Sequence, residues 1–179
     1  MANVIATLRD SAAAPGWTRW MMGLMLTLAA CCAQAQQAPA LSLDVQGKIA
    51  NTNDAEHRVY HFSEAQLLAL PTHTITTATT WTPRSTFTGP LLSDILKVVG
   101  ASGTEIEFHT FDDYTYTVPV SDCERYGVIV AYAMNGQRLK ISDFGPLFLI
   151  YPRDAYPNEL TGAGGDSKFV WQIKALLVR

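Results

Sequence analysis

The chain has 179 residues, enough for one domain with a modest core, and 48% of them are hydrophobic while 16% are charged. This composition excludes an intrinsically disordered protein. The formal net charge is −3 and the basic residues form no stripe, so the charge balance argues against a nucleic-acid-binding protein.

The first 35 residues are typical of an export signal. Arg9 and Arg19 flank the start, residues 21–30 form an apolar run, and residues 33–35 give an A-x-A cleavage site. The apolar run has about ten residues, whereas a membrane-spanning helix needs roughly 20. The sequence therefore predicts a signal peptide over residues 1–35 and a periplasmic or secreted protein.

A second interpretation of the same region stays open. Residues 28–31 read Leu-Ala-Ala-Cys, which resembles the lipobox of bacterial lipoproteins, where the cysteine is lipidated. Lipidation of Cys31 would anchor the protein to a membrane. In both cases we expect residues 36–40 to be a linker and residues 41–179 to be the folded domain.

The domain begins with two predicted strands, at residues 41–47 and 59–62, where apolar and polar residues alternate. Ser63 to Gln66 form a capping box, which predicts a helix start. We expect this helix to bury Leu67, Leu68 and Leu70 and to end at Pro71.

Residues 72–81 are rich in threonine and include Ile75, a composition that favours a buried strand. A loop follows, and Gly89-Pro90 is predicted to open a helix whose apolar residues recur at helical spacing until Gly100.

The middle of the chain predicts a hairpin and a short helix. Strands at residues 105–111 and 114–119 are joined across Asp112-Asp113. Residues 121–124 form a second capping box, and the helix that it predicts ends by Gly127.

The last third predicts strands at residues 128–134, 144–152 and 169–178. A glycine-rich loop is expected at residues 156–167. Asn135-Gly136 is the strongest hairpin signal in the chain because both residues tolerate positive φ. The expected architecture is α+β, with eight or nine mostly antiparallel strands and about three short helices.

Generic catalytic and metal motifs are weak. His57 and His61 are four residues apart, but in a predicted turn and strand they would not share a helix face as a zinc pair does. No G-x-S-x-G elbow occurs, and the glycines at 162–165 neither follow a strand directly nor open a helix. Once the signal is removed, Cys123 is the remaining cysteine, and we expect it to be a buried small residue.

Five segments, in this order and spacing, resemble the sulfite oxidase-type molybdopterin-binding domain: WTPRSTFTGPLLSDIL, YTVPVSDC, VIVAYAMNGQRL, GPLFLIYP and FVWQIKALLV. The resemblance spans residues 43–178 and is closest to a branch of short, stand-alone, exported bacterial proteins. It implies a sulfite oxidase-like molybdopterin-binding fold. Members of the family bind molybdopterin through basic and polar side chains and oxidise sulfite or reduce sulfoxides.

Three matching positions depart from the family pattern. Thr77 stands where a cysteine supplies sulfur to molybdenum, and a hydroxyl cannot replace a soft thiolate ligand. Phe148 stands where the family often has arginine, and Val170 where it often has lysine. Together these changes remove groups that would hold a metal and a phosphate, although Arg153 and Lys168 could supply replacement charge.

The resemblance still implies a cofactor or ligand pocket. The residues that it places there are aromatic, basic or polar: Thr77, Trp81, Arg84, Tyr114, Tyr151, Arg153, Lys168 and Trp171. The aromatic rings suit a flat ligand and the cations an anionic one. The alternative is that the two tryptophans are core anchors and the cations are surface charges. No catalytic or metal-ligating residue is assigned.

Three functions remain open. The first is a non-catalytic ligand-binding or accessory module for a small anionic or pterin-like ligand. The second is a molybdopterin-dependent oxidoreductase with altered metal ligation, so molybdopterin is the one cofactor implied and molybdenum is the part in doubt. The third is a structural subunit bound to a protein partner in the periplasm. Fold alone does not choose among them.

Overall fold

The computed structural model describes residues 41–179, so the predicted signal peptide, the linker and Cys31 lie outside the described residues. Among the described residues, eleven strands are found: β1 (Leu43–Gly47), β2 (Tyr60–Phe62), β3 (Thr72–Thr77), β4 (Ser85–Pro90), β5 (Glu105–Thr110), β6 (Thr115–Pro119), β7 (Ile129–Ala131), β8 (Ala133–Met134), β9 (Gln137–Arg138), β10 (Phe148–Ile150) and β11 (Ile173–Val178).

The helices of the described region are short: α2 (Glu64–Ala69), α3 (Leu92–Val99), α4 (Ser121–Tyr126), α5 (Pro157–Leu160) and α6 (Gly162–Asp166), with a 3₁₀ turn, η1 (Arg153–Ala155). None of them is long and apolar enough to cross a membrane.

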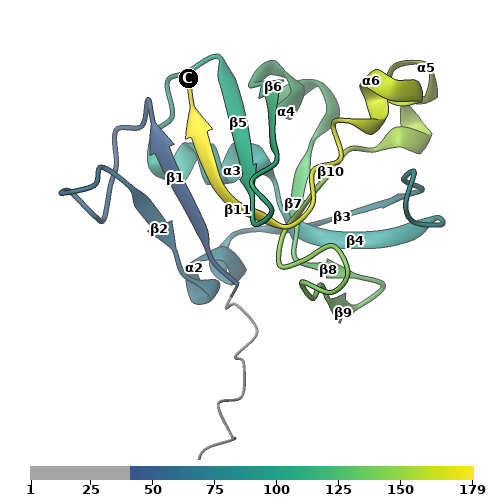
Figure 1. Cartoon of the computed structure of the whole chain (residues 1–179), viewed down its shortest axis with the longest axis horizontal. Helices are drawn as coiled ribbons and strands as arrows, with labels where there is room; N and C mark the ends of the chain where they lie inside the picture. Colours follow the sequence, from purple (N-terminus) through teal and green to yellow (C-terminus); the bar gives the residue numbers. More distant parts are fainter. Residues whose placement is uncertain (1–40) are drawn as a thin grey trace, which may run out of the picture. The chain divides into compact units, whose positions relative to one another are not determined.

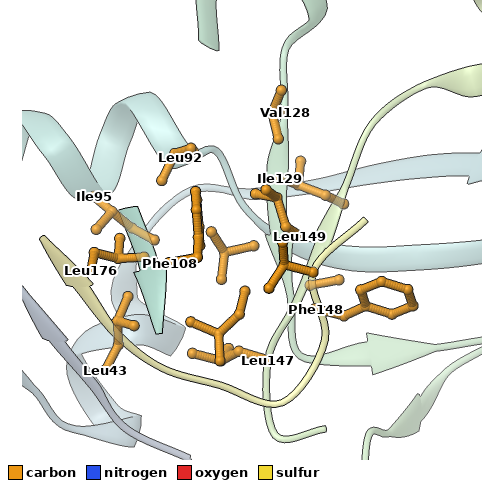
Figure 2. Packing of buried hydrophobic residues seen from close by; sticks show 14 of the residues in the cluster. Leu43, Leu92, Ile95, Phe108, Val128, Ile129, Leu147, Phe148, Leu149 and Leu176 are labelled. Atoms are coloured by element: carbon orange, nitrogen blue, oxygen red, sulfur yellow. The ribbon is translucent and has the colours of Figure 1, made fainter. Parts of the chain in front are cut away.

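The larger sheet has the strand order β2-β1-β11-β5-β6 (Figure 1). Only β1 and β11 run parallel, and the other neighbours are antiparallel. Figure 2 shows the core on one side of this sheet, where Leu43, Phe108 and Leu176 meet Leu92 and Ile95 of α3. All five side chains are fully buried, so hydrophobic burial fixes the helix against the sheet.

A second sheet has the order β3-β4-β8-β9, and β10 pairs with β7 in a third. Strand β4 passes close to β7 at Gly89. A Cβ atom at Gly89 would lie 2.1 Å from the carbonyl oxygen of Val130, so only glycine permits this approach. The close approach holds the second sheet against the central core.

The α+β class and the predominance of antiparallel pairing are confirmed. The capping box at Ser63 forms, with its hydroxyl accepting from the N–H of Gln66. Asn135 and Gly136 both adopt positive φ between β8 and β9, as the hairpin signal predicts. Gly100 and Gly127 end their helices in the left-handed conformation.

The predicted strand, loop and helix at residues 72–100 need two corrections. Residues 85–90 are not loop but strand β4, which lies between β3 and β8. Strand β3 is an edge strand and mostly exposed, so its threonines reflect β propensity and not burial. It ends at Thr77, earlier than Trp81, because Thr79 closes a local turn with Thr82.

The predicted capping box at residues 121–124 is wrong. Val120 is the residue before α4, and no side chain caps the helix. Instead Asp122 turns inward, where the hydroxyl of Tyr151 and the amine of Lys168 donate to it. A buried ionic contact therefore replaces the cap.

The remaining differences concern the last third of the chain and one helix face. Residues 157–166 form two short helices where a loop is predicted, which raises the number of helices to five within residues 41–179. Only Phe148–Ile150 of the predicted strand at 144–152 is extended and paired. Strand β11 begins at Ile173 because Gln172 has a φ of 56°. Of the three leucines expected to be buried by helix α2, Leu67 is buried, Leu68 is exposed, and Leu70, which follows α2, is half-buried.

Candidate functional site

A pocket of about 320 Å³ lies where three segments distant in the sequence meet. The loop after β3, the β5–β6 turn and the chain between α6 and β11 form its walls. Its lining residues are Trp81, Thr110, Asp112, Tyr114, Asp166, Ser167, Phe169, Val170 and Trp171. The volume is at the small end of the range for ligand sites, roughly 300–1,000 Å³.

Two tryptophans form one corner of the pocket. The rings of Trp81 and Trp171 meet edge to face, with centroids 4.3 Å apart and planes 69° from parallel. The hydroxyl of Thr79 accepts hydrogen bonds from the N–H groups of Trp81 (3.2 Å) and Thr82 (3.0 Å), which fixes the loop that carries Trp81. Trp81 is 41% exposed, so it is not a core anchor.

The β5–β6 turn supplies a carboxylate to the opposite wall. Asp112 accepts hydrogen bonds from the hydroxyl of Thr110 and from the N–H of Tyr114 (3.3 Å). The hydrogen bond from Thr110, and then that from Tyr114, lowers the pKa of Asp112 below its ordinary value of 3.8, so this side chain is charged at neutral pH. The ring of Tyr114 stands beside it and is 48% exposed.

Arg153, a predicted binding residue, is paired with neighbouring groups of the chain. Arg153 forms an ion pair with Asp166, and its Nε donates to the carbonyl oxygen of Leu160 (2.9 Å). Its guanidinium also lies 4.8 Å from the centroid of the Phe169 ring. Arg153 therefore contacts both α5 and α6 and holds them in place, and it is not a lining residue of the pocket.

Lys168 lies between two lining residues in the sequence, but its side chain is bound elsewhere. Its amine pairs with the buried carboxylate of Asp122, which also accepts from the hydroxyl of Tyr151 (2.9 Å). Tyr151 is completely buried, and burial together with the charge of Asp122 raises the pKa of its hydroxyl. The Lys168–Asp122–Tyr151 group is thus an internal hydrogen-bonded unit.

Thr77 and Arg84 meet at a third carboxylate. The Thr77 hydroxyl donates to Oδ1 of Asp154 (3.0 Å) and accepts from the backbone N–H of Asp154 (3.1 Å). Arg84 forms an ion pair with Oδ2 of the same side chain (3.1 Å). Thr77 is fully buried and is not among the lining residues, so it ties β3 to η1.

The side chains present do not fit molybdenum held by a protein sulfur. Thr77, which the sequence resemblance assigns to the family's thiolate position, carries a hydroxyl group that donates a hydrogen bond to the carboxylate of Asp154 and accepts one from its backbone N–H. Cys123 is the only cysteine among residues 41–179, and burial raises the pKa of its thiol to about 12, so it offers no thiolate. Phe148 and Val170, where the family often has cations, are buried apolar residues.

Three of the eight predicted binding residues, Trp81, Tyr114 and Trp171, line one pocket. The other five are not lining residues, and each contacts an aspartate: Thr77 and Arg84 contact Asp154, Tyr151 and Lys168 contact Asp122, and Arg153 contacts Asp166. The sequence argument missed Asp112, Asp166 and Phe169. The signal for Asp112 was available, since this acid stands between Phe111 and Tyr114 in a turn.

The fold is that of a known class of oxidoreductase domains. The crystal structure of the sulfane dehydrogenase SoxCD from Paracoccus pantotrophus aligns with a TM-score of 0.56 at 18% sequence identity. The alignment covers 76% of this chain and 37% of the SoxCD chain, so the present chain spans little more than a third of that protein chain. At this identity the similarity establishes the fold only.

The model of the oxidoreductase molybdopterin binding domain family matches residues 42–155. The chain therefore belongs to that family, and the fold and family expected from the sequence are confirmed. No curated protein matches the sequence. The lining residues from Asp166 to Trp171 lie beyond the matched segment, so part of the pocket is built by residues outside it.

Proposed function

We propose that this chain is a non-catalytic, ligand-binding member of the family, exported by the signal at residues 1–35. The hydrogen bonding of Thr77 is the observation that carries the proposal. At the position of the family's metal-binding sulfur, both hydrogen-bonding roles of a buried hydroxyl are taken by Asp154. A hard oxygen donor in that state cannot serve as a soft ligand.

The arrangement of charge supports the same conclusion. The three cations expected to meet an anionic cofactor, Arg84, Arg153 and Lys168, are each paired with an aspartate of this chain. An anion would have to displace an internal carboxylate to reach Arg153 or Lys168, whose side chains are mostly buried, whereas the largely exposed Arg84 does not line the pocket. A pocket with aromatic walls remains, which suits binding without redox chemistry.

The test is the cofactor content of the exported protein. We expect protein purified from the periplasm of a host that makes molybdopterin to contain neither molybdenum nor pterin in stoichiometric amount. Elemental analysis and fluorescence of the oxidised pterin measure the two separately. Stoichiometric molybdenum would overturn the proposal in favour of an oxidoreductase with altered ligation, and a stable complex with an empty pocket would favour a structural subunit.

Thr77→Cys is the sharper version of this test. We expect the variant to remain free of molybdenum, because the new thiol would be buried beside Asp154 and the nearby cations would still be paired. Thr76→Cys is the matched control, because Thr76 is the exposed neighbour on β3 and a thiol there reports adventitious metal uptake. Stoichiometric molybdenum in Thr77→Cys alone would show that the cofactor site is intact apart from one atom.

A further inference from the structure

The pocket wall is acidic, although several basic residues of the same chain lie close in sequence to the lining residues. Its lining residues include two aspartates, Asp112 and Asp166, and no lysine or arginine. Arg153 neutralises Asp166, but the hydrogen-bond donors to Asp112 are the neutral Thr110 and Tyr114. One carboxylate charge therefore faces the pocket without an ion pair inside it.

Lys174 is the basic side chain paired with the next residue of the turn, because its amine forms an ion pair with Asp113 (2.8 Å). The hydrogen bonds from Thr110 and Tyr114 lower the pKa of Asp112 more than the charge of Lys174 does. The two adjacent aspartates thus differ in kind. Asp113 is exposed and paired with Lys174, whereas Asp112 lines the pocket and is bonded to the turn.

The remaining walls are aromatic. Trp81 and Trp171 form a corner, and Tyr114 and Phe169 complete the set of rings around the volume. The face of an aromatic ring carries negative charge from its quadrupole, so several rings beside a carboxylate attract a cation that is poorly hydrated. The same walls repel a phosphate or carboxylate ligand because no cation lines them.

We propose that this pocket binds a small organic cation of the quaternary ammonium or alkylated amine class, with Asp112 as its counter-ion. This inference rests on the proposed function, since it names the ligand class of the same non-catalytic site. The volume of about 320 Å³ suits a ligand of this size.

Choline and 3,3-dimethylbutan-1-ol test the charge directly, because the two molecules share a shape and differ in a positive nitrogen against a neutral carbon. After removal of residues 1–35, Trp81 and Trp171 are the only tryptophans, so their fluorescence reports the pocket. We expect choline to change this fluorescence saturably and to bind about tenfold more tightly than the alcohol. Equal affinities, or tighter binding of pterin-6-carboxylate, would overturn the inference.

Asp112→Asn and Asp113→Asn form a matched pair. The amide oxygen at 112 can still accept from Thr110 and Tyr114, so the turn is retained while the charge is lost. We expect Asp112→Asn to weaken choline binding about tenfold and Asp113→Asn to change it less than about twofold. Loss of affinity in both variants, or in neither, contradicts the assignment of Asp112. If Asp112→Asn fails to fold, the comparison of choline with the alcohol decides alone.

The two proposals fail separately. Stoichiometric molybdenum in the isolated protein defeats the proposed function, and the organic-cation inference that rests on it falls with it. Pterin bound without molybdenum keeps a non-catalytic ligand-binding function and defeats the organic-cation inference. A protein free of both that does not prefer choline keeps the proposed function and defeats the organic-cation inference.

Discussion

Aspartates decide what the cations of this chain can bind. Asp122, Asp154 and Asp166 each hold one basic side chain that a sequence argument assigns to an anionic ligand. The Asp154 pair is largely exposed on its arginine side, and such pairs contribute only about 0–1 kcal/mol to stability. Their larger effect is on recognition, because an occupied guanidinium or ammonium is not free for a phosphate.

His61 makes the stability of the domain depend on pH. Its ring nitrogens contact Asp44 (2.6 Å) and Asp54 (3.4 Å), and the hydrogen bond to Asp44 raises its pKa above 6.5. Protonated His61 therefore stabilises the fold below about pH 6.5, and this contribution is lost as the pH rises through the raised pKa of the folded state. We therefore expect the contribution of His61 to the free energy of unfolding of the wild-type protein to decrease as the pH rises from about 6.5 through the raised pKa of His61.

His61→Gln should flatten that pH dependence, and denaturant unfolding at several pH values between about 5.5 and 8.5 measures it. The control is His73→Gln, which removes a histidine from the edge strand β3 and should leave the slope unchanged. An unchanged slope in His61→Gln would show that another group carries the dependence.

At the scale of elements, the short helices α5 and α6 set the position of one pocket wall. Gly165 of α6 packs on Leu160 of α5, and a Cβ atom there would lie 2.3 Å from the Leu160 carbonyl carbon. Gly164 has no atom within 4 Å of its own Cβ position. Adjacent glycines therefore offer a matched test of whether close helix packing places Asp166 and Ser167 in the wall.

We expect Gly165→Ala to destabilise the protein by about 1–3 kcal/mol, because the backbone of Leu160 must move. Gly164→Ala should be neutral or stabilising by up to about 1 kcal/mol, since alanine favours a helix and has room. Chemical denaturation measures both. Equal destabilisation by the two variants would indicate that loss of flexibility, and not packing, is responsible.

These helices also show where sequence reasoning stops. The Ser63 capping box and the Asn135-Gly136 turn depend on neighbouring residues alone, and the structure contains both. Residues 157–166 carry four glycine and proline residues, whose local preference is for loop, yet they form two helices. These helices pack on each other at Leu160 and Gly165, and Arg153 donates to the Leu160 carbonyl oxygen. Strand β4 was missed for a similar reason, since its pairing with β3 and β8 is not local.

The candidate site follows the same division. The aromatic members Trp81, Tyr114 and Trp171 follow from the sequence resemblance, because they lie in or next to its matching segments, and all three line the pocket. The sequence does not predict where the side chains of Arg153 and Lys168 point, because each is held by an aspartate at least 13 residues away in the chain. Charge in a sequence shows which groups exist, whereas contacts between distant segments decide which of them face a ligand.

At the scale of the whole domain, the chain is closed by its last strand. Strand β11 lies between β1 and β5 at the centre of the five-stranded sheet (Figure 1). Its side chains Ile173, Leu176 and Val178 are buried in the core. The backbone of Arg179 also exchanges hydrogen bonds with Glu105 at the start of β5. Residues 156–179 therefore complete the sheet although the family model ends at residue 155.

This topology predicts that a chain ending at Ala155 will not fold. Removing β11 would separate β1 from β5, leave two inner strand edges unpaired and expose the apolar side chains that Ile173 and Leu176 cover. We expect such a chain to show no cooperative thermal transition by circular dichroism, whereas a chain that begins at Leu41, the first described residue, keeps the transition of the protein without residues 1–35. A cooperative transition in the shortened chain would mean that β1 and β5 can pair without β11, and the pocket wall from Asp166 to Trp171 would then be an addition to a finished domain.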